Sequence, residues 1–319
     1  MSADDSKATR RSFLGAATGL AAAAGLGGAA GVGITTASQA GEIPAGTLDP
    51  LDPKRAGLPY RQDDPRWGAD LMWNRASVLN VATREEGFSA TEAEALMREF
   101  PDGNNIANEG CQLTCLAMVL RLLNPGRKPA WTPGNLNTAA HDGLYYTLSG
   151  LSVSTLYSDM GSDLTDGSVQ LVAKEEYPIG QPGWPRVTTE TSPLACAYLS
   201  LDQSQRASTL LMLKTGTWDD TVASHYVLID PTSPSNPEQA NPPILDPAMP
   251  EGRGGAWTLS DSAKWIRQDP EIDRAWSKQG IGPLNIGGAW AFSRFDAGAG
   301  SNLAAPLIAA WSKQLADHT

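Results

Sequence analysis

The sequence predicts an α+β fold in which a buried helix packs on an antiparallel β-sheet. Helical patterns dominate the chain up to the helix that is predicted to begin at Thr132, and short apolar segments bounded by turn residues dominate from residue 168 onward. This grouping of helices before strands favours α+β over a regular alternation of the two. The segment 111–123 is apolar on nearly all sides, which is typical of a helix inside a protein.

Residues 1–40 are predicted to be an export signal. The pair Arg10 and Arg11 precedes an Ala/Gly-rich apolar run, which resembles a twin-arginine signal. The run is long enough to span a bilayer, so an uncleaved anchor is the alternative, although its many glycines weaken it as a permanent helix. Ser38 and Ala40 supply small residues for cleavage, after which we expect no stable membrane insertion. The twin-arginine export machinery is thus a predicted partner, and the mature protein is expected to be secreted or in the periplasm or cell envelope.

Composition argues against several classes of protein and against a metal site. The formal net charge of −11 is unfavourable for binding nucleic acid or an anionic membrane surface. Three cysteines, an odd count, do not make a disulfide framework for 319 residues, and neither C-x-x-C nor H-E-x-x-H spacing occurs. Asp159, Asp163 and Asp166 lack the alternate spacing of a calcium loop and are expected in a solvated turn. We therefore expect no cofactor and no metal.

Glycine, proline and capping residues divide the first half of the remaining chain into elements. Residues 41–58 are predicted to be a linker, and a capped surface helix is predicted at 89–100. The central helix, 111–123, ends at an Asn-Pro-Gly breaker, and another helix is predicted to begin at Thr132.

The second half is predicted to consist mostly of strands, with a short helix at 193–201. The segments with strand character are 169–172, 209–214, 223–230, 257–260 and 290–293. Residues 301–319 have an apolar face at helical spacing and are expected to dock on the domain as an amphipathic helix. Residues 59–300 then form one large domain.

Cys111 is the candidate nucleophile because it stands at the start of the buried helix. The free N–H groups and the positive end of the helix dipole favour a thiolate there. The alternative is a structural cysteine, since cysteine is among the most buried residue types. A free thiol outside the cytoplasm calls for a reason, which catalysis supplies. Cys115 and Cys196 are expected to be small core residues.

His225 and Asp246 follow Cys111 in the order nucleophile, base, orienting group. His141 and His318 are the other histidines, but one lies in a turn soon after Cys111 and the other at the chain end. Asp230 ends the strand that begins near His225, about 16 Å away along it, too far to orient the ring.

Several segments, in order, resemble the C39-like cysteine peptidases, a papain-like group. The segment GCQLTCLAM resembles their Gly-Cys-(Gly)-(Pro)-Thr-Ser-x-Ala-Met signature. The accompanying matches are PYRQDDPRW to Pro-Tyr-x-Gln-x-Asp-x-x-Trp, TPGNLN to Thr-Pro-x-x-Leu-Asn, and HYVLI with ILDP to a His-x-Val-Leu-Val and Asp-Pro strand pair. The resemblance covers about residues 59–260, and Gln112 and Leu113 depart from the Gly-Pro that relatives often have.

The resemblance implies a papain-like fold and an exported cysteine peptidase or amidase. Cys111 would attack a carbonyl to form a thioester acyl-enzyme, with His225 as base and then acid and Asp246 orienting the ring. Two adjacent antiparallel strands would place His225 beside Asp246. The backbone N–H of Cys111 would supply one oxyanion donor and the side chain of Gln62 the second, with Asn105 as the alternative.

The predicted substrate is a peptide, an isopeptide or a peptidoglycan-type amide. A different interpretation is a catalytically inactive papain-like domain that binds cell-envelope ligands in the same cleft. A third is an exported structural protein in which Cys111 is simply buried. Reactivity of Cys111 toward a thiol-specific electrophile, and its dependence on His225, distinguishes these interpretations.

Overall fold

The computed structural model describes most of the chain from residue 58 onward. The described residues are 58–72, 79, 82–84, 87–97, 105–142, 146–147, 150–151, 164–165, 167–177, 187–216, 225–233, 236, 239–251, 257–296 and 301–317. The predicted signal 1–40, residues 41–57 of the predicted linker, the three aspartates of the predicted solvated turn and His318 lie outside them.

The first half of the described chain is helical, as predicted. Its helices are α3 (Ala90–Met97), α4 (Ile106–Glu109), α5 (Cys111–Leu123) and α6 (Pro133–Asp142). A reciprocal cap between Ser89 and Glu92 starts α3, and one between Thr132 and Asn135 starts α6. The prediction of a buried central helix is confirmed, since ten of the thirteen residues of α5 are buried.

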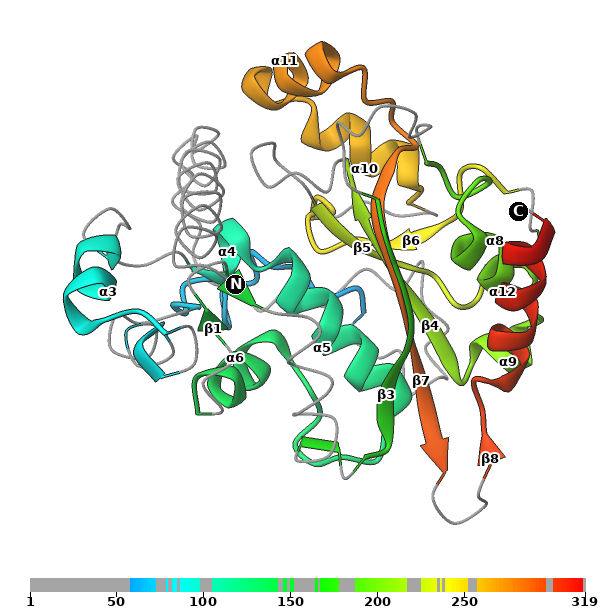
Figure 1. The fold of residues 1–319 in the computed structure, drawn as a ribbon, viewed down its shortest axis with the longest axis horizontal. Coiled ribbons are helices and arrows are strands. Elements are labelled where there is room, and N and C mark those ends of the chain that lie inside the picture. Colours follow the sequence, from blue (N-terminus) through cyan, green and yellow to red (C-terminus); the bar gives the residue numbers. More distant parts are fainter. Residues whose placement is uncertain are drawn as a thin grey trace, which may run out of the picture.

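A six-stranded antiparallel sheet follows the helices. Its strands are β3 (Val169–Glu176), β4 (Thr209–Thr215), β5 (His225–Ile229), β6 (Ile244–Leu245), β7 (Ile286–Asp296) and β8 (Ser301–Asn302). They are ordered β3-β7-β4-β5-β6, with β8 paired to β7 (Figure 1). A separate two-stranded pair joins β1 (Tyr146–Thr147) to β2 (Gly150–Leu151). The strands predicted near 169, 209, 225 and 290 are confirmed, with residues 223–224 outside the described part.

Further helices are placed between and after the strands. They are α8 (Pro193–Ser200), α9 (Gln203–Arg206), α10 (Leu259–Ile266), α11 (Pro270–Gln279) and α12 (Ala305–Asp317). The short helix predicted at 193–201 and the C-terminal helix are confirmed, although β8 occupies residues 301–302.

The strand predicted at 257–260 is wrong, because this segment starts α10. The side chain of Thr258 accepts a hydrogen bond from the backbone of Asp261, whose side chain bonds back to Thr258. This reciprocal capping box satisfies free N–H groups at the helix start and outweighs a four-residue apolar pattern. An isolated antiparallel bridge between Pro243 and Thr258 also involves the segment.

The sheet is covered on both faces. Leu210 and Met212 of β4 join the core cluster of α5, whereas Leu211 and Leu213 join the cluster of α8 and α12. The alternation follows from the pleat, which turns successive side chains to opposite faces. All of β4 is therefore buried, and α5 lies on the opposite side of the sheet from α8 and α12 in Figure 1.

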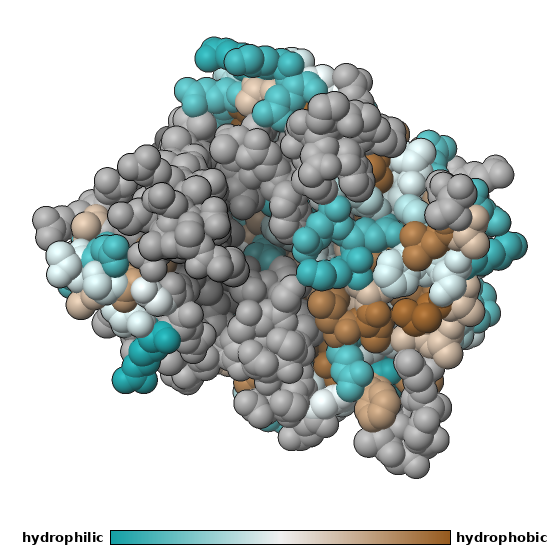
Figure 2. All heavy atoms as spheres, in the orientation of Figure 1, coloured by the Kyte–Doolittle hydropathy of each residue, from teal (hydrophilic) through white to brown (hydrophobic). Residues whose placement is uncertain are grey.

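The α10–α11 pair forms a small helical unit next to the sheet (Figure 1). Trp276 is buried in its own cluster with Ala263 and Ile281, while the outer surface of α11 is polar in Figure 2. Among the described residues, no helix has the length and hydrophobicity required to cross a membrane.

Candidate functional site

Cys111 is the first residue of α5, directly after the short helix α4. Gly110 joins the two helices, and a Cβ at this position would overlap the carbonyl oxygen and Cγ2 of Ile106. Only glycine fits this close approach without a shift of α4. The glycine of the motif thus sets the angle at which α5 begins and presents the thiol.

Cys111 is a partly exposed residue, and its thiol forms a hydrogen bond with the side chain of His225. Burial, the largest single cause, raises the pKa of this thiol. The hydrogen bond and charge of His225 and the backbone hydrogen bonds from Tyr226 and Gln112 together outweigh burial, and the net effect lowers the pKa. The surroundings therefore favour a thiolate.

His225 and Asp246 are brought together by the pairing of β5 with β6. The strands are antiparallel, as the family resemblance implied, and their register places Leu228 opposite Leu245. His225 begins β5 and Asp246 follows β6, so the two side chains meet at one end of the pair. Nε2 of His225 lies 2.6 Å from Oδ1 of Asp246, which leaves Nδ1 of the ring for the thiol of Cys111.

The charges of Cys111, His225 and Asp246 each favour the ionised form of the neighbouring side chain. Burial lowers the pKa of His225, but Asp246 and then Cys111 raise it more, to about 10. Burial raises the pKa of Asp246, but the charge and hydrogen bond of His225, together with hydrogen bonds from Ser262 and Ala248, lower it more. At neutral pH the imidazolium and the carboxylate therefore form a buried ion pair.

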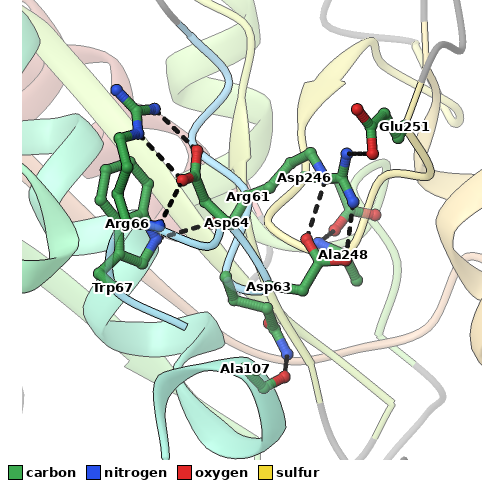
Figure 3. Close-up of polar contacts among 10 residues, drawn as sticks. Arg61, Asp63, Asp64, Arg66, Trp67, Ala107, Asp246, Ala248 and Glu251 are labelled. Atoms are coloured by element: carbon green, nitrogen blue, oxygen red, sulfur yellow. Dashed lines mark hydrogen bonds and ion pairs between the residues drawn. The ribbon is translucent and has the colours of Figure 1, made fainter. Parts of the chain in front are cut away.

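Asp246 has no exposed surface and is bound on both carboxylate oxygens. Besides His225, Oδ1 accepts a hydrogen bond from the backbone N–H of Ala248 at 2.8 Å (Figure 3). Oδ2 accepts one from the indole N–H of Trp257, also at 2.8 Å. Sequence reasoning missed Trp257, because one tryptophan among ten in a segment predicted as a strand carried no signal of this contact.

Gln62 links the two halves of the site. Its side-chain Nε2 donates to the carbonyl of Ala107 in α4 at 2.7 Å, and its backbone N–H donates to the carbonyl of Pro247 at 3.0 Å. The amide nitrogen of Gln62 carries two hydrogens. One is donated to Ala107, and the second can be donated to another acceptor. Asn105 is engaged as the cap of α4, with its Oδ1 accepting from the backbone of Asn108 at 3.0 Å.

The segment that carries Gln62 is held by its neighbours in sequence. Arg61 forms ion pairs with Asp63 at 2.7 Å and with Glu251 at 3.0 Å (Figure 3). The indole of Trp67 donates to the carbonyl of Arg61 at 2.8 Å. Glu251 is largely exposed, so its ion pair contributes little stability by itself. These contacts connect the segment to the loop after Asp246.

The other candidates lie in different surroundings. Nε2 of His141 contacts the carbonyl of Leu71, and Asp230 accepts hydrogen bonds from Thr232 in its own turn. Cys115 and Cys196 are buried, as predicted, and burial raises the pKa of both thiols. Among the described residues, no cluster of His, Cys, Asp and Glu side chains is suited to hold a metal ion.

Comparisons of the chain with protein-family models, with curated proteins and with solved structures found no match. Within the chain itself, a continuous series of contacts runs from Cys111 through His225 to Asp246.

Proposed function

We propose that this protein is an exported, papain-like cysteine hydrolase of the C39-like type, which cleaves peptide or isopeptide bonds, including peptidoglycan-type amides. The observation that carries the proposal is the contact of Cys111 with a histidine that is paired to a fully buried aspartate. A structural cysteine needs no histidine partner and is normally buried, whereas Cys111 is a partly exposed residue. Both the histidine contact and the partial exposure favour a nucleophile over a core residue.

In the acylation step, the thiolate of Cys111 attacks the carbonyl carbon of the substrate amide. The carbonyl electron pair moves onto oxygen and produces a tetrahedral oxyanion. As this intermediate collapses, the C–N bond breaks and the imidazolium of His225 gives its proton to the leaving amine. The products of this step are a free amine and a thioester on Cys111.

In the deacylation step, neutral His225 takes a proton from water, and the resulting hydroxide attacks the thioester. The C–S bond then breaks, the acid product leaves, and the thiolate–imidazolium pair is restored. Asp246 remains ionised throughout and holds the ring in position. The pKa of about 10 for His225 fits a group that carries its proton at rest.

The backbone N–H of Cys111 at the start of α5 is one proposed donor to the oxyanion. Gln62 is the proposed second donor, because its amide is oriented by Ala107 and retains an N–H. Asn105 supports this role less well, since its side chain already caps α4.

The deciding experiment compares wild-type protein with Cys111→Ala on peptide mixtures and on purified cell-wall material. Cys196→Ala is the matched control, because Cys196 is also a thiol but hydrogen-bonds to Thr189 and Glu190 in another part of the fold. We expect new amide cleavage products from wild type and from Cys196→Ala, and none from Cys111→Ala. Equal products from all three proteins would refute the proposal. Binding without cleavage by wild type would instead support the ligand-binding interpretation.

A further inference from the structure

The second oxygen of Asp246 is held by a residue that the proposed mechanism does not use. Asp246 is fully buried, and its Oδ1 is occupied by His225 and by Ala248. Oδ2 is bound by the indole N–H of Trp257 at 2.8 Å. A carboxylate with donors on both oxygens is limited to one orientation.

We propose that Trp257 is a positioning residue for the site, whose indole N–H holds Oδ2 of Asp246 so that Oδ1 stays directed at His225. The inference rests on the proposed function, because it concerns the same three side chains. It goes beyond that function by assigning a task to a residue outside the set of Cys111, His225 and Asp246.

Trp257 is fixed well enough to orient a neighbour. Its side chain is only 4% exposed and belongs to the core cluster on the α8 and α12 side of the sheet. Its backbone carbonyl accepts a hydrogen bond from Ile244 of β6 at 2.8 Å, and the next residue, Thr258, caps α10. The indole is thus tied both to the strand that precedes Asp246 and to the start of a helix.

The contact also bears on the charge of the site. The titratable groups that interact with Asp246 are His225 and, from α5, Cys115. Its other neighbours on the β6–α10 side are neutral: the N–H of Ala248, the indole of Trp257 and the hydroxyl of the buried Ser262. Loss of the indole N–H removes one neutral donor and leaves a buried carboxylate oxygen with fewer partners. With Oδ2 no longer held, the carboxylate can turn away from the ring of His225, so it supports the imidazolium less well and the thiolate of Cys111 becomes less favourable.

The first test is the pH dependence of Cys111 alkylation by iodoacetamide in Trp257→Phe, which keeps an aromatic ring but removes the N–H. We expect the alkylation midpoint to rise by about one pH unit, with roughly tenfold slower reaction on the acid side. Trp276→Phe is the control, because Trp276 is equally buried but lies in the separate α10–α11 cluster. An unchanged midpoint in folded Trp257→Phe, or the same shift in both variants, would overturn the inference.

The second test combines Trp257→Phe with Asp246→Asn and measures thermal unfolding of both single variants and the double variant. In Asp246→Asn, the amide N–H can face the indole N–H, so removing the indole donor should cost less than it does beside the carboxylate. Should Trp257→Phe alone fail to fold, recovery of the fold in the double variant supports the contact. If the losses of thermal stability in the two single variants simply add in the double variant, or if the double variant also fails to fold, the fold needs the indole ring of Trp257 for packing and not its N–H.

These measurements do not require a substrate, so they separate the inference from the proposed function. A wild-type protein that shows the expected alkylation behaviour but hydrolyses no amide would refute the hydrolase proposal and leave the role of Trp257 standing. A wild-type thiol of Cys111 that titrates with an ordinary pKa would refute the inference itself.

Discussion

Replacement of Asp246 by Asn and by Ala tests how the site keeps His225 protonated. Two unit charges about 4 Å apart interact by about 4 kcal/mol at an effective dielectric constant of about 20, which corresponds to about three pKa units. The pKa of His225 rises from 6.5 to about 10, with Asp246 as the largest raising cause, Cys111 as a further one, and burial opposing both. Loss of the carboxylate charge should therefore return the pKa of His225 most of the way to its ordinary value.

The two variants should nevertheless differ. The carbonyl of Asn can still accept from His225 and Ala248, which preserves the direction of the ring. Its amide nitrogen, however, replaces the oxygen that accepts from Trp257 at 2.8 Å, and two facing donors cost about 1–3 kcal/mol of stability. Ala provides neither acceptor. We expect kcat/KM at pH 7 to fall about tenfold for Asp246→Asn and up to about a hundredfold for Asp246→Ala.

The assay is the pH profile of kcat/KM on a peptide that wild type cleaves, together with the pH profile of Cys111 alkylation. The folded pKa of His225 is raised, so the imidazolium is present below about pH 10 and is lost as the pH rises through that value. In both variants the alkaline limit of the thiolate–imidazolium state should move toward neutral pH. If both variants match wild type in rate and in profile, another group supports His225 and the reasoning is wrong.

Three further predictions address the thiol, the oxyanion donors and export. In wild type, alkylation of Cys111 should persist below the ordinary thiol pKa of about 8.5, and a profile that follows that value would contradict the ion pair. Gln62→Ala should lower kcat by about a hundredfold with little change in unfolding temperature, whereas Asn105→Ala should lower stability by about 1 kcal/mol and leave kcat unchanged; the reverse pattern would assign the oxyanion role to Asn105. Replacement of Arg10 and Arg11 by Lys should leave folded protein in the cytoplasm, as measured by fractionation, and unchanged export would exclude the twin-arginine route.

The central helix was predictable from the sequence for physical reasons, whereas the meeting of His225 with Asp246 was implied by the family resemblance. A thirteen-residue segment that is apolar on nearly all sides has few options other than a buried helix. The HYVLI and ILDP segments resembled a strand pair of a known family, and the structure contains this antiparallel pair. In both cases the pattern was long, or was supported by a second segment.

The predictions from sequence failed where a sequence pattern was only a few residues long, or where a contact joins residues that are distant in the sequence. Four residues beginning at Trp257 were predicted as a strand, although Thr258 and Asp261 form a capping box that starts a helix. Because of the same error, Trp257 was not recognised as a hydrogen-bond partner of Asp246. Nothing in the local sequence indicates that an indole eleven positions away will reach a carboxylate, because packing of α10 beside β6 determines that contact.

The site lies against a sheet that is packed on both faces, so the charges of His225 and Asp246 are buried. A buried ion pair such as His225 with Asp246 is costly to desolvate, and removal of one partner typically destabilises a protein by about 3–5 kcal/mol. The hydrogen bonds from Ala248 and Trp257 reduce this cost for the carboxylate. The apolar clusters on both faces of β4 bury the sheet, and Trp257 belongs to one of them. Trp257 therefore takes part both in the packing of the sheet and in holding the carboxylate of Asp246, so the thiolate of Cys111 depends in part on that packing.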